Sequence, residues 1–216
     1  MIELFDPNSL AVVGGGTLLA TLVHCGPKAC RLTVAVLLSA ATHKFDFVKA
    51  RAEVSRQIAD IEQDGLVRSD PNPIGDQEID DATAALVKSR SLAGLSSEHD
   101  RHRRQRLQRS QIAQSVLLKA AELGPILGLA GTLLALAGLV SPDTTASSSI
   151  ANAIGTAVLT TLYGLLLSNF VFAPLASLVD RKARNEDLAR EELFAWMEAK
   201  ILEADPRTRR PLEVAR

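Results

Sequence analysis

Uncharged apolar residues fill two long stretches in the second half of the chain. Leu123–Val140 and Ile150–Val179 contain no Asp, Glu, Lys, Arg or His. A helix on the surface of a soluble protein carries polar residues at every third or fourth position, and these stretches do not. Their length fits membrane spans of about 20 residues. Ser141-Pro142-Asp143 between them is a turn signal. The pattern predicts a membrane-spanning helical hairpin, in preference to a soluble bundle with two buried helices.

A third apolar stretch lies near the start of the chain. Pro7–Pro27 contains no Lys, Arg, Asp or Glu, and we expect a membrane span around its apolar core, Leu10–Val23. Leu32–Ala41 is too short to cross a bilayer and favours an interfacial or buried amphipathic helix. Residues 1–8 contain two acidic residues and no basic one, so they do not have the pattern of a cleavable signal peptide.

Charged residues in helical periodicity occupy the rest of the chain. We expect helices at Phe45–Asp64, at Ile79–Leu95 with Asp76 as cap, and from Ser96 through Lys119 into the second span. The last span should continue to Glu203. The predicted class is an all-α polytopic membrane protein with three transmembrane helices and long cytoplasmic helical extensions. The segments are 1–27 (N-terminal end and first span), 28–118 (cytoplasmic helices), 119–179 (pore-lining hairpin) and 180–216 (cytoplasmic helix and tail).

The basic residues predict which side of the membrane each segment faces. Residues 44–119 and the tail after residue 180 are rich in Lys and Arg, whereas the first nine residues and residues 141–149 have none. By the positive-inside rule, the middle segment and the C-terminus face the cytoplasm and the N-terminus faces the periplasm. Three crossings satisfy this arrangement.

Composition and motifs exclude several function classes. The net charge is −1, and the basic run Arg101–Arg106 lacks interleaved aromatic residues, so we interpret it as a solvated helix face and expect no nucleic-acid partner. Cys25 and Cys30 are too few for a disulfide framework. His99 and His102 share a helix face without a third ligand nearby, so we expect no metal and no cofactor. Without a nucleophile–base pair or phosphate loop, the chain is predicted not to be an enzyme.

Small and polar residues within the spans are the candidate functional groups. Gly124 and Gly128 have the spacing that lets membrane helices approach closely. Pro125 and Pro174 should kink their helices or free carbonyl groups. Two interpretations of the hydroxyls and amides stay open, namely helix packing and a polar pathway or subunit interface. The predicted packing residues are Gly124, Gly128, Gly131 and Gly164, and the other polar residues are Thr132, Asn152, Thr156, Thr160, Thr161, Ser168 and Asn169.

Neither half of the hairpin supplies an ionisable group that could carry a proton through the bilayer. Glu122, at the start of the second span, is the nearest acid and is expected at the interface. If protons cross beside this chain, a partner helix therefore has to bring the carboxylate.

Three segments resemble one family of membrane proteins. The sequence Ala-Glu-Leu-Gly-Pro-Ile-Leu-Gly-Leu-Ala-Gly-Thr-Leu at 121–133 resembles the third membrane helix of MotA and the second of TolQ and ExbB. Residues 157–176 resemble the final helix of the MotA branch, and residues 6–22 resemble its second helix. Over most of residues 6–200 the chain is similar to the MotA/TolQ/ExbB proton channel family.

The resemblance implies an ion-driven motor stator or energiser subunit of the bacterial inner membrane. Such a homopentamer surrounds a dimer of a single-span MotB/TolR/ExbD-like protein that carries the essential Asp. Ion-motive force, from protons or alternatively sodium, then becomes mechanical work. The pore-lining or coupling residues would be Pro125, Thr132, Thr160, Thr161 and Pro174.

Departures from the family pattern bear on which role applies. A counterpart of the first helix of four-span MotA is missing, and Thr156 stands where TolQ and ExbB carry an acid. Glu62 falls where flagellar MotA presents a basic residue to the rotor, while Asp70 keeps the acidic position. Asp70 and Arg90 are the predicted contacts with a cytoplasmic partner. The alternative function is a non-conducting membrane scaffold that recruits cytoplasmic partners through its long helices.

Overall fold

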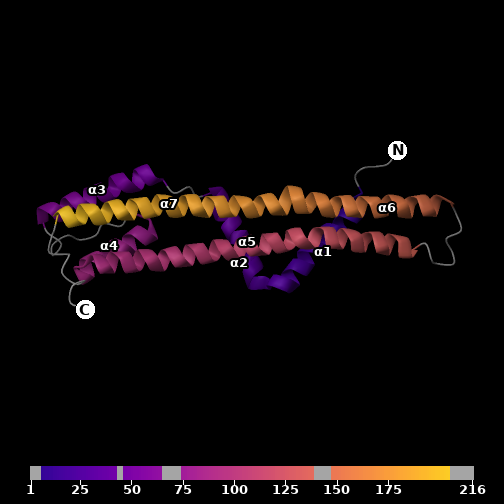
Figure 1. Cartoon of the computed structure of the whole chain (residues 1–216), viewed down its shortest axis with the longest axis horizontal. Helices are drawn as coiled ribbons and strands as arrows, with labels where there is room; N and C mark the ends of the chain where they lie inside the picture. The colour runs from indigo at the N-terminus through magenta and orange to yellow at the C-terminus, as the bar shows by residue number, and fades with distance from the viewer. Residues whose placement is uncertain (1–5, 43–45, 65–73, 139–146, 205–216) are drawn as a thin grey trace. The chain divides into compact units, whose positions relative to one another are not determined.

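The computed structural model describes residues 6–42, 46–64, 74–138 and 147–204, and within these ranges all of the regular structure is helical. Figure 1 shows the helices in chain order. They are α1 (Pro7–Cys25), α2 (Pro27–Thr42), α3 (Phe47–Asp64), α4 (Gln77–Ser89), α5 (Leu92–Ala137), α6 (Ser147–Leu166), the π-helix η2 (Leu167–Phe172) and α7 (Ala173–Ala204).

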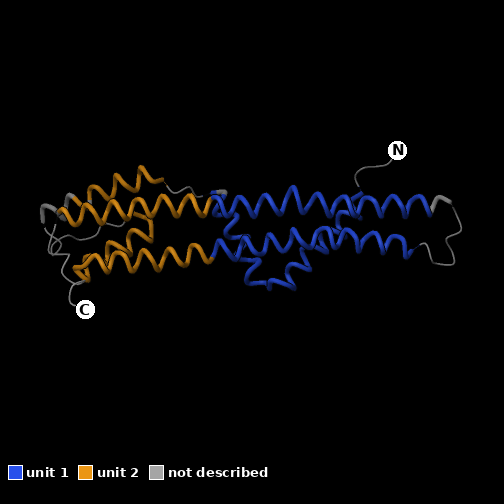
Figure 2. Tube along the Cα trace, in the orientation of Figure 1, with its two compact units in different colours: residues 1–42, 109–181 blue, residues 43–108, 182–216 orange. Residues whose placement is uncertain are grey.

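Contacts between residues divide the chain into two compact units, coloured separately in Figure 2. Unit 1 comprises residues 1–42 and 109–181, and unit 2 comprises residues 43–108 and 182–216. The long helices α5 and α7 contribute residues to both units. Each unit is therefore built from segments that are distant in the sequence.

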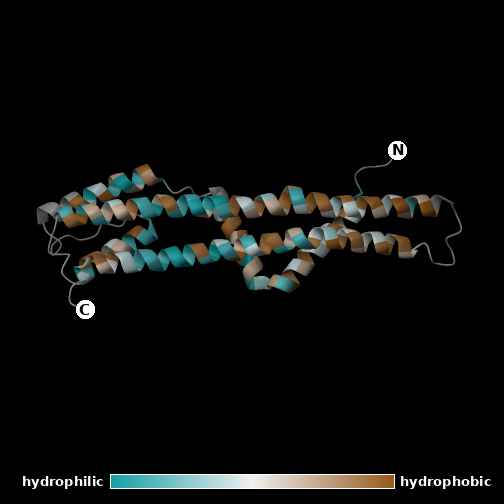
Figure 3. Ribbon diagram, viewed as in Figure 1, coloured by the Kyte–Doolittle hydropathy of each residue, from teal (hydrophilic) through white to brown (hydrophobic). Residues whose placement is uncertain are grey.

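Within the described ranges, three helices are long and apolar enough to cross a membrane, which confirms the three predicted spans. Large apolar side chains on these helices remain exposed, among them Leu19, Leu133 and Val158. Figure 3 shows that residues coloured as hydrophobic make up much of α6. Water would disfavour so much exposed apolar area, whereas lipid or a neighbouring membrane helix accommodates it. The chain is an all-α membrane protein, as its sequence predicts.

The packing of unit 1 joins helices from both ends of the chain. Val13 on α1 is buried against Leu159 and Tyr163 on α6. A second cluster combines residues of α5 and α7 with two residues of α2, namely Ala113, Leu117, Ala176 and Val179 with Val36 and Leu37. In the hairpin, α6 thus packs against α1, whereas α5 and α7 pack against α2.

Local signals fix the ends of α1. The Asp6 carboxylate accepts the Asn8 N–H at 3.0 Å, and Pro7 occupies the first turn, where its missing N–H costs nothing. Gly26 ends the helix with φ of 81°, a conformation that glycine adopts without a steric penalty. The next helix begins at Pro27, so the predicted short helix Leu32–Ala41 is longer at its start than expected.

Unit 2 has the apolar core of a soluble helical bundle. Its fully buried side chains come from α4, α5 and α7, and they are Ile79, Leu86, Leu95, Leu193, Met197 and Ile201. Ala50, Val54 and Ile58 on α3 complete the cluster. This burial contrasts with the exposed apolar surface of unit 1, as expected for a segment that folds in water.

One predicted helix is divided differently in the structure. The expected helix Ile79–Leu95 ends at Ser89 because Arg90 adopts the left-handed conformation, with φ of 51° and ψ of 36°. The Ser91 hydroxyl then accepts the Ala93 N–H at 3.1 Å, which starts α5. Leu95 therefore belongs to α5. The prediction of one long helix into the second span, and of Asp76 as the cap of α4, is confirmed.

Candidate functional site

Glycines set the distance between α5 and α6 in the hairpin. A Cβ atom on Gly164 would lie 2.5 Å from the carbonyl oxygen of Gly124 and 3.1 Å from Cα of Gly128. A Cβ on Gly128 would in turn lie 3.0 Å from the carbonyl oxygen of Thr160. In each case the atom that the added Cβ would meet belongs to the backbone of the facing helix. Gly124, Gly128 and Gly164 therefore lie where α5 and α6 approach each other closely.

Polar contacts connect the hairpin at two further places. The Ser168 hydroxyl donates to the Ala121 carbonyl oxygen at 2.5 Å, which joins η2 to α5. The Asp6 N–H donates to the Tyr163 hydroxyl at 2.9 Å, which joins the start of α1 to α6. Lipid offers no hydrogen-bond partner to a polar group, so these two bonds satisfy groups that the hydrocarbon would leave unpaired. They also fix the positions of the joined helices along one another.

The three predicted pore threonines differ in burial. Thr160 is only 3% exposed and packs against Gly131, where an added Cβ would lie 2.9 Å from the Thr160 Cβ. Thr132 and Thr161 are half-buried and lie outside this contact. Each hydroxyl donates to a carbonyl of its own helix, at distances of 2.6 to 3.3 Å. We therefore group Thr160 with the glycine contact and keep the other two as candidates for an ion path.

The two predicted prolines lie on different helices. Pro125 is half-buried inside α5, seven positions before Thr132, so the two residues share a helix face. Pro174 is exposed at the second position of α7, directly after η2. A proline donates no backbone hydrogen bond, and the wider π turn precedes it in the chain.

The predicted contacts with a cytoplasmic partner are only partly visible. Arg90 is exposed in the turn between α4 and α5. Asp70 lies outside the described residues.

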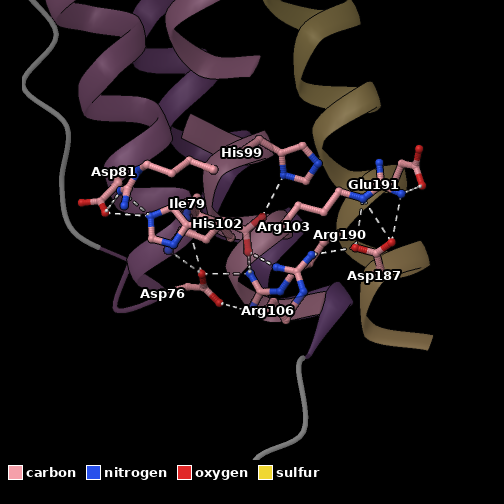
Figure 4. Close-up of polar contacts among 12 residues, drawn as sticks. Asp76, Ile79, Asp81, His99, His102, Arg103, Arg106, Asp187, Arg190 and Glu191 are labelled. Atoms are coloured by element: carbon pink, nitrogen blue, oxygen red, sulfur yellow. Dashed lines mark hydrogen bonds and ion pairs between the residues drawn. The ribbon is translucent and has the colours of Figure 1, made fainter. Parts of the chain in front are cut away.

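A network of charged side chains links α4, α5 and α7 in unit 2, as Figure 4 shows. Arg190 makes a bidentate pair with Asp76 at 2.7 and 3.0 Å and also reaches Glu78 at 3.3 Å. The Glu78 side chain is 6% exposed and the Arg190 side chain is 10% exposed. Arg106 pairs with Glu78 and, at 2.9 Å, with Asp187. Buried charges of this kind depend on their partners, since water does not stabilise them.

Histidine and arginine extend this network. His99 is buried, with Nδ1 at 2.8 Å from Glu78 Oε1 and its ring stacked on Phe194 at 4.0 Å between centroids. Arg103 pairs with Asp187 at 3.0 Å and with Glu191 at 3.3 Å. The sequence interpretation of Arg101–Arg106 as a solvated face was wrong for Arg103 and Arg106. Their acidic partners on α7 lie more than 80 positions away, so no local pattern could have identified them.

Asp81, Glu98 and His102 bring three potential metal ligands within 4.8 Å of one another. Of the two histidines that the sequence places on one helix face, only His102 belongs to this set, because His99 contacts Glu78. The guanidinium of Arg101, however, donates to Glu98 at 2.6 Å and lies 3.3 Å from Asp81. A cation from the chain itself already neutralises the set, so we assign it no metal.

Asp76 makes the stability of unit 2 depend on pH. Burial disfavours the charged form, but hydrogen bonds and charge from Arg190 outweigh it and hold the pKa of Asp76 below its ordinary value. The resulting stabilisation is complete above the ordinary aspartate pKa of about 4 and is lost as pH falls through the lower folded value. We expect wild-type unfolding temperature to fall between neutral pH and about pH 3. Circular dichroism melts should show a flatter pH dependence for Asp76→Asn, and an identical dependence would contradict this role.

Comparisons with known proteins cover most of the chain. A family model described as the MotA/TolQ/ExbB proton channel family matches residues 71–192. Uncharacterized protein YtxD of Bacillus subtilis (strain 168) is 27% identical over 198 residues, which make up 85% of this chain and 68% of that protein. Motility protein A of Treponema pallidum (strain Nichols) is 29% identical over 191 residues, or 81% of this chain and 68% of that protein. Motility protein A of Cereibacter sphaeroides is 27% identical over 129 residues, and the match covers 60% of this chain and 51% of that protein.

Solved structures show the same fold. The C. jejuni MotAB structure matches with a TM-score of 0.78 and 17% identity, and the match covers 95% of this chain and 81% of that chain. The flagellar MotAB stator complex from Bacillus subtilis matches with a TM-score of 0.76 and 16% identity over 98% of this chain and 86% of that chain.

Proposed function

This chain belongs to the MotA/TolQ/ExbB proton channel family, and from that premise we propose that it is a MotA-like energiser subunit that couples ion flow to mechanical work. The family match at residues 71–192 includes all of α5 and α6 and most of α7, and so both helices of the hairpin. In this proposal the chain acts as a channel and stator subunit rather than as an enzyme.

The observation that carries the proposal is the uncharged hairpin. Leu123–Val140 and Ile150–Val179 hold no Asp, Glu, Lys, Arg or His, yet they carry prolines and hydroxyls outside the glycine contact. A proton needs an ionisable group within the bilayer. We propose that a single-span MotB/TolR/ExbD-like partner dimer supplies this group as an aspartate, and that the hairpin forms the wall beside it.

We assign four residues to that wall. They are Pro125 and Thr132 on α5, Thr161 on α6 and Pro174 on α7. The threonine hydroxyls offer hydrogen bonds to the ion or to its water, and the prolines leave carbonyl groups without their usual donors. The transported ion is a proton, with sodium as the alternative.

The assembly and orientation follow from the surface and the charges. The exposed apolar side chains of α1, α5 and α6 suit both lipid and neighbouring copies, and a pentamer around the partner dimer would cover part of them. Because Lys and Arg gather in residues 44–119 and after residue 180, we place the N-terminus in the periplasm and the C-terminus in the cytoplasm of a bacterial inner membrane. The roles proposed above for segments 1–27, 28–118, 119–179 and 180–216 go with this orientation.

Thr161→Val should lower ion flux about fivefold, since it removes one hydroxyl hydrogen bond without changing the side-chain volume. The measurement is proton uptake by vesicles that contain the complex, with assembly followed by size-exclusion chromatography. Thr17→Val is the matched control, because the Thr17 hydroxyl also bonds its own helix, at 2.7 Å, but lies buried on α1. Equal flux in both variants and in the wild type would remove Thr161 from the path.

Identifying the proteins that bind this chain distinguishes the energiser function from the scaffold function. Co-purification from native membranes, followed by mass spectrometry, should recover a small protein with one span and an aspartate within it. An oligomer without any acid-bearing partner would leave the chain with no carrier inside its hairpin, and the scaffold interpretation would then replace the energiser.

A further inference from the structure

The backbone of the last membrane span changes register at η2. Between Leu167 and Phe172 the helix has π rather than α geometry, and Figure 1 shows α6, η2 and α7 as one uninterrupted ribbon. The Ala173 N–H donates to the Ser168 carbonyl oxygen, a bond that spans five residues instead of four. Single π turns inside α-helices are rare and are frequent at functional sites.

The register change leaves the Asn169 carbonyl group without a backbone donor. In the π register the next N–H, at position 174, would bond the Asn169 carbonyl, but residue 174 is proline and has no N–H. In the α register the donor would be Ala173, and that N–H is already bonded to Ser168. The Asn169 carbonyl oxygen is therefore left without either of its two main-chain donors.

The polar side chains next to this carbonyl group make their hydrogen bonds elsewhere. Asn169 is exposed in the described chain, and its Nδ2 group donates one turn back, to the Leu165 carbonyl at 3.0 Å. The neighbouring Ser168 is buried and uses its hydroxyl on α5. The next residue, Phe170, is 75% exposed and apolar, as a lipid-facing side chain would be.

An unsatisfied carbonyl group within a membrane span costs several kcal/mol if it faces hydrocarbon. Proteins accept such groups where the backbone lines water or a polar cavity. Residues 150–179 contain no carboxylate and no histidine, so a backbone oxygen is among the strongest acceptors that this span offers to a donor. The oxygen is directed along the helix toward position 174, the proline that we assign to the path wall.

We infer that the Asn169 carbonyl oxygen binds a water molecule of the ion path and so forms a hydration step for the passing cation beside Pro174. The inference rests on the proposed function, and it adds a residue that the sequence analysis counted only among the polar residues of the span. The acceptor is a backbone atom, so the identity of residue 174 controls it more than the side chain at 169 does.

Infrared spectroscopy tests the carbonyl directly. The full-length chain, in its complex from native membranes, is labelled with [1-¹³C]asparagine, and the spectrum of Asn169→Gln is subtracted to isolate position 169 from the other asparagines. We expect a carbonyl band at the frequency of a hydrated amide that shifts rapidly in D₂O. A band at the frequency of an intrahelical amide without rapid exchange would overturn the inference.

Pro174→Ala tests the consequence, because it restores an N–H at position 174. The carbonyl band should move to the intrahelical frequency, and ion flux should fall about fivefold, the equivalent of one hydrogen bond. If flux is unchanged in Pro174→Ala but reduced in Thr161→Val, the carbonyl is not on the path and the proposed function stands. If neither variant alters flux in an assembled complex, the proposed function fails with it.

Discussion

Gly164→Ala should prevent α5 and α6 from packing and leave little assembled protein in the membrane. The added Cβ would lie 2.5 Å from the Gly124 carbonyl oxygen and 3.1 Å from the Cα of Gly128. Both obstacles are backbone atoms on the facing helix, so no side-chain rotation relieves the overlap. Overpacking costs about 1–3 kcal/mol where side chains can adjust, and we expect about 3 kcal/mol or more here.

Gly155→Ala is the matched control on the same helix. A Cβ at Gly155 meets nothing within 4 Å, and alanine favours a helix over glycine by about 1 kcal/mol. The control should therefore melt at the wild-type temperature or above it, whereas Gly164→Ala should melt lower and elute as dissociated or aggregated material. A Gly164→Ala protein with wild-type stability would show that the hairpin can repack, and the close approach would then not be required.

Arg190→Leu should destabilise unit 2 by about 3–5 kcal/mol, the range for breaking a buried ion pair. Arg190 is the common partner of Asp76 and Glu78, and Glu78 is almost fully buried. Removing the guanidinium leaves Asp76 without this bidentate pair and leaves the buried Glu78 with one cation fewer, beside Arg106. The desolvated carboxylates are then less well compensated. Thermal unfolding followed by circular dichroism measures the loss.

Two further variants separate this mechanism from a loss of packing. Arg101→Ala removes an arginine that is 45% exposed and should change the melting temperature little, because exposed pairs contribute little. Asp76→Asn in the Arg190→Leu background should recover part of the stability, since it removes the carboxylate charge that lost its ion pair with Arg190. No recovery in the double variant would attribute the effect of Arg190 to packing of its aliphatic stem.

The predicted spans and helices were right because they depend on local chemistry. A stretch of about 20 apolar residues can satisfy its backbone in lipid only as a helix. Asp76 was identified as a cap because aspartate before a helix accepts backbone N–H bonds. The left-handed turn at Arg90 was missed, since arginine gives no signal for positive φ and only the packing of α4 and α5 residues in one core requires it.

The candidate site was likewise predicted only in part from the sequence. The glycine pattern predicted close helix approach, and the structure gives that contact its partners, from Gly124 against Gly164 to Gly131 against Thr160. Whether a given threonine faces the contact or lies outside it depends on the rotation of each helix. Thr160 and Thr161 are adjacent in sequence but about 100° apart around the helix, so one is buried and the other is half-buried.

The sequence by itself determined the class of the protein, its three membrane spans and the absence of Asp, Glu, Lys, Arg and His from Leu123–Val140 and Ile150–Val179, because each of these is a property of a continuous stretch of residues. Only the tertiary structure decided the pairing of Glu78 with Arg106 and Arg190, the burial of Thr160 and the π register ahead of Pro174. Those features join residues on different helices or depend on how one helix meets its neighbour. Local pattern carries no information about such distances, since the same periodicity is compatible with many arrangements of packed helices.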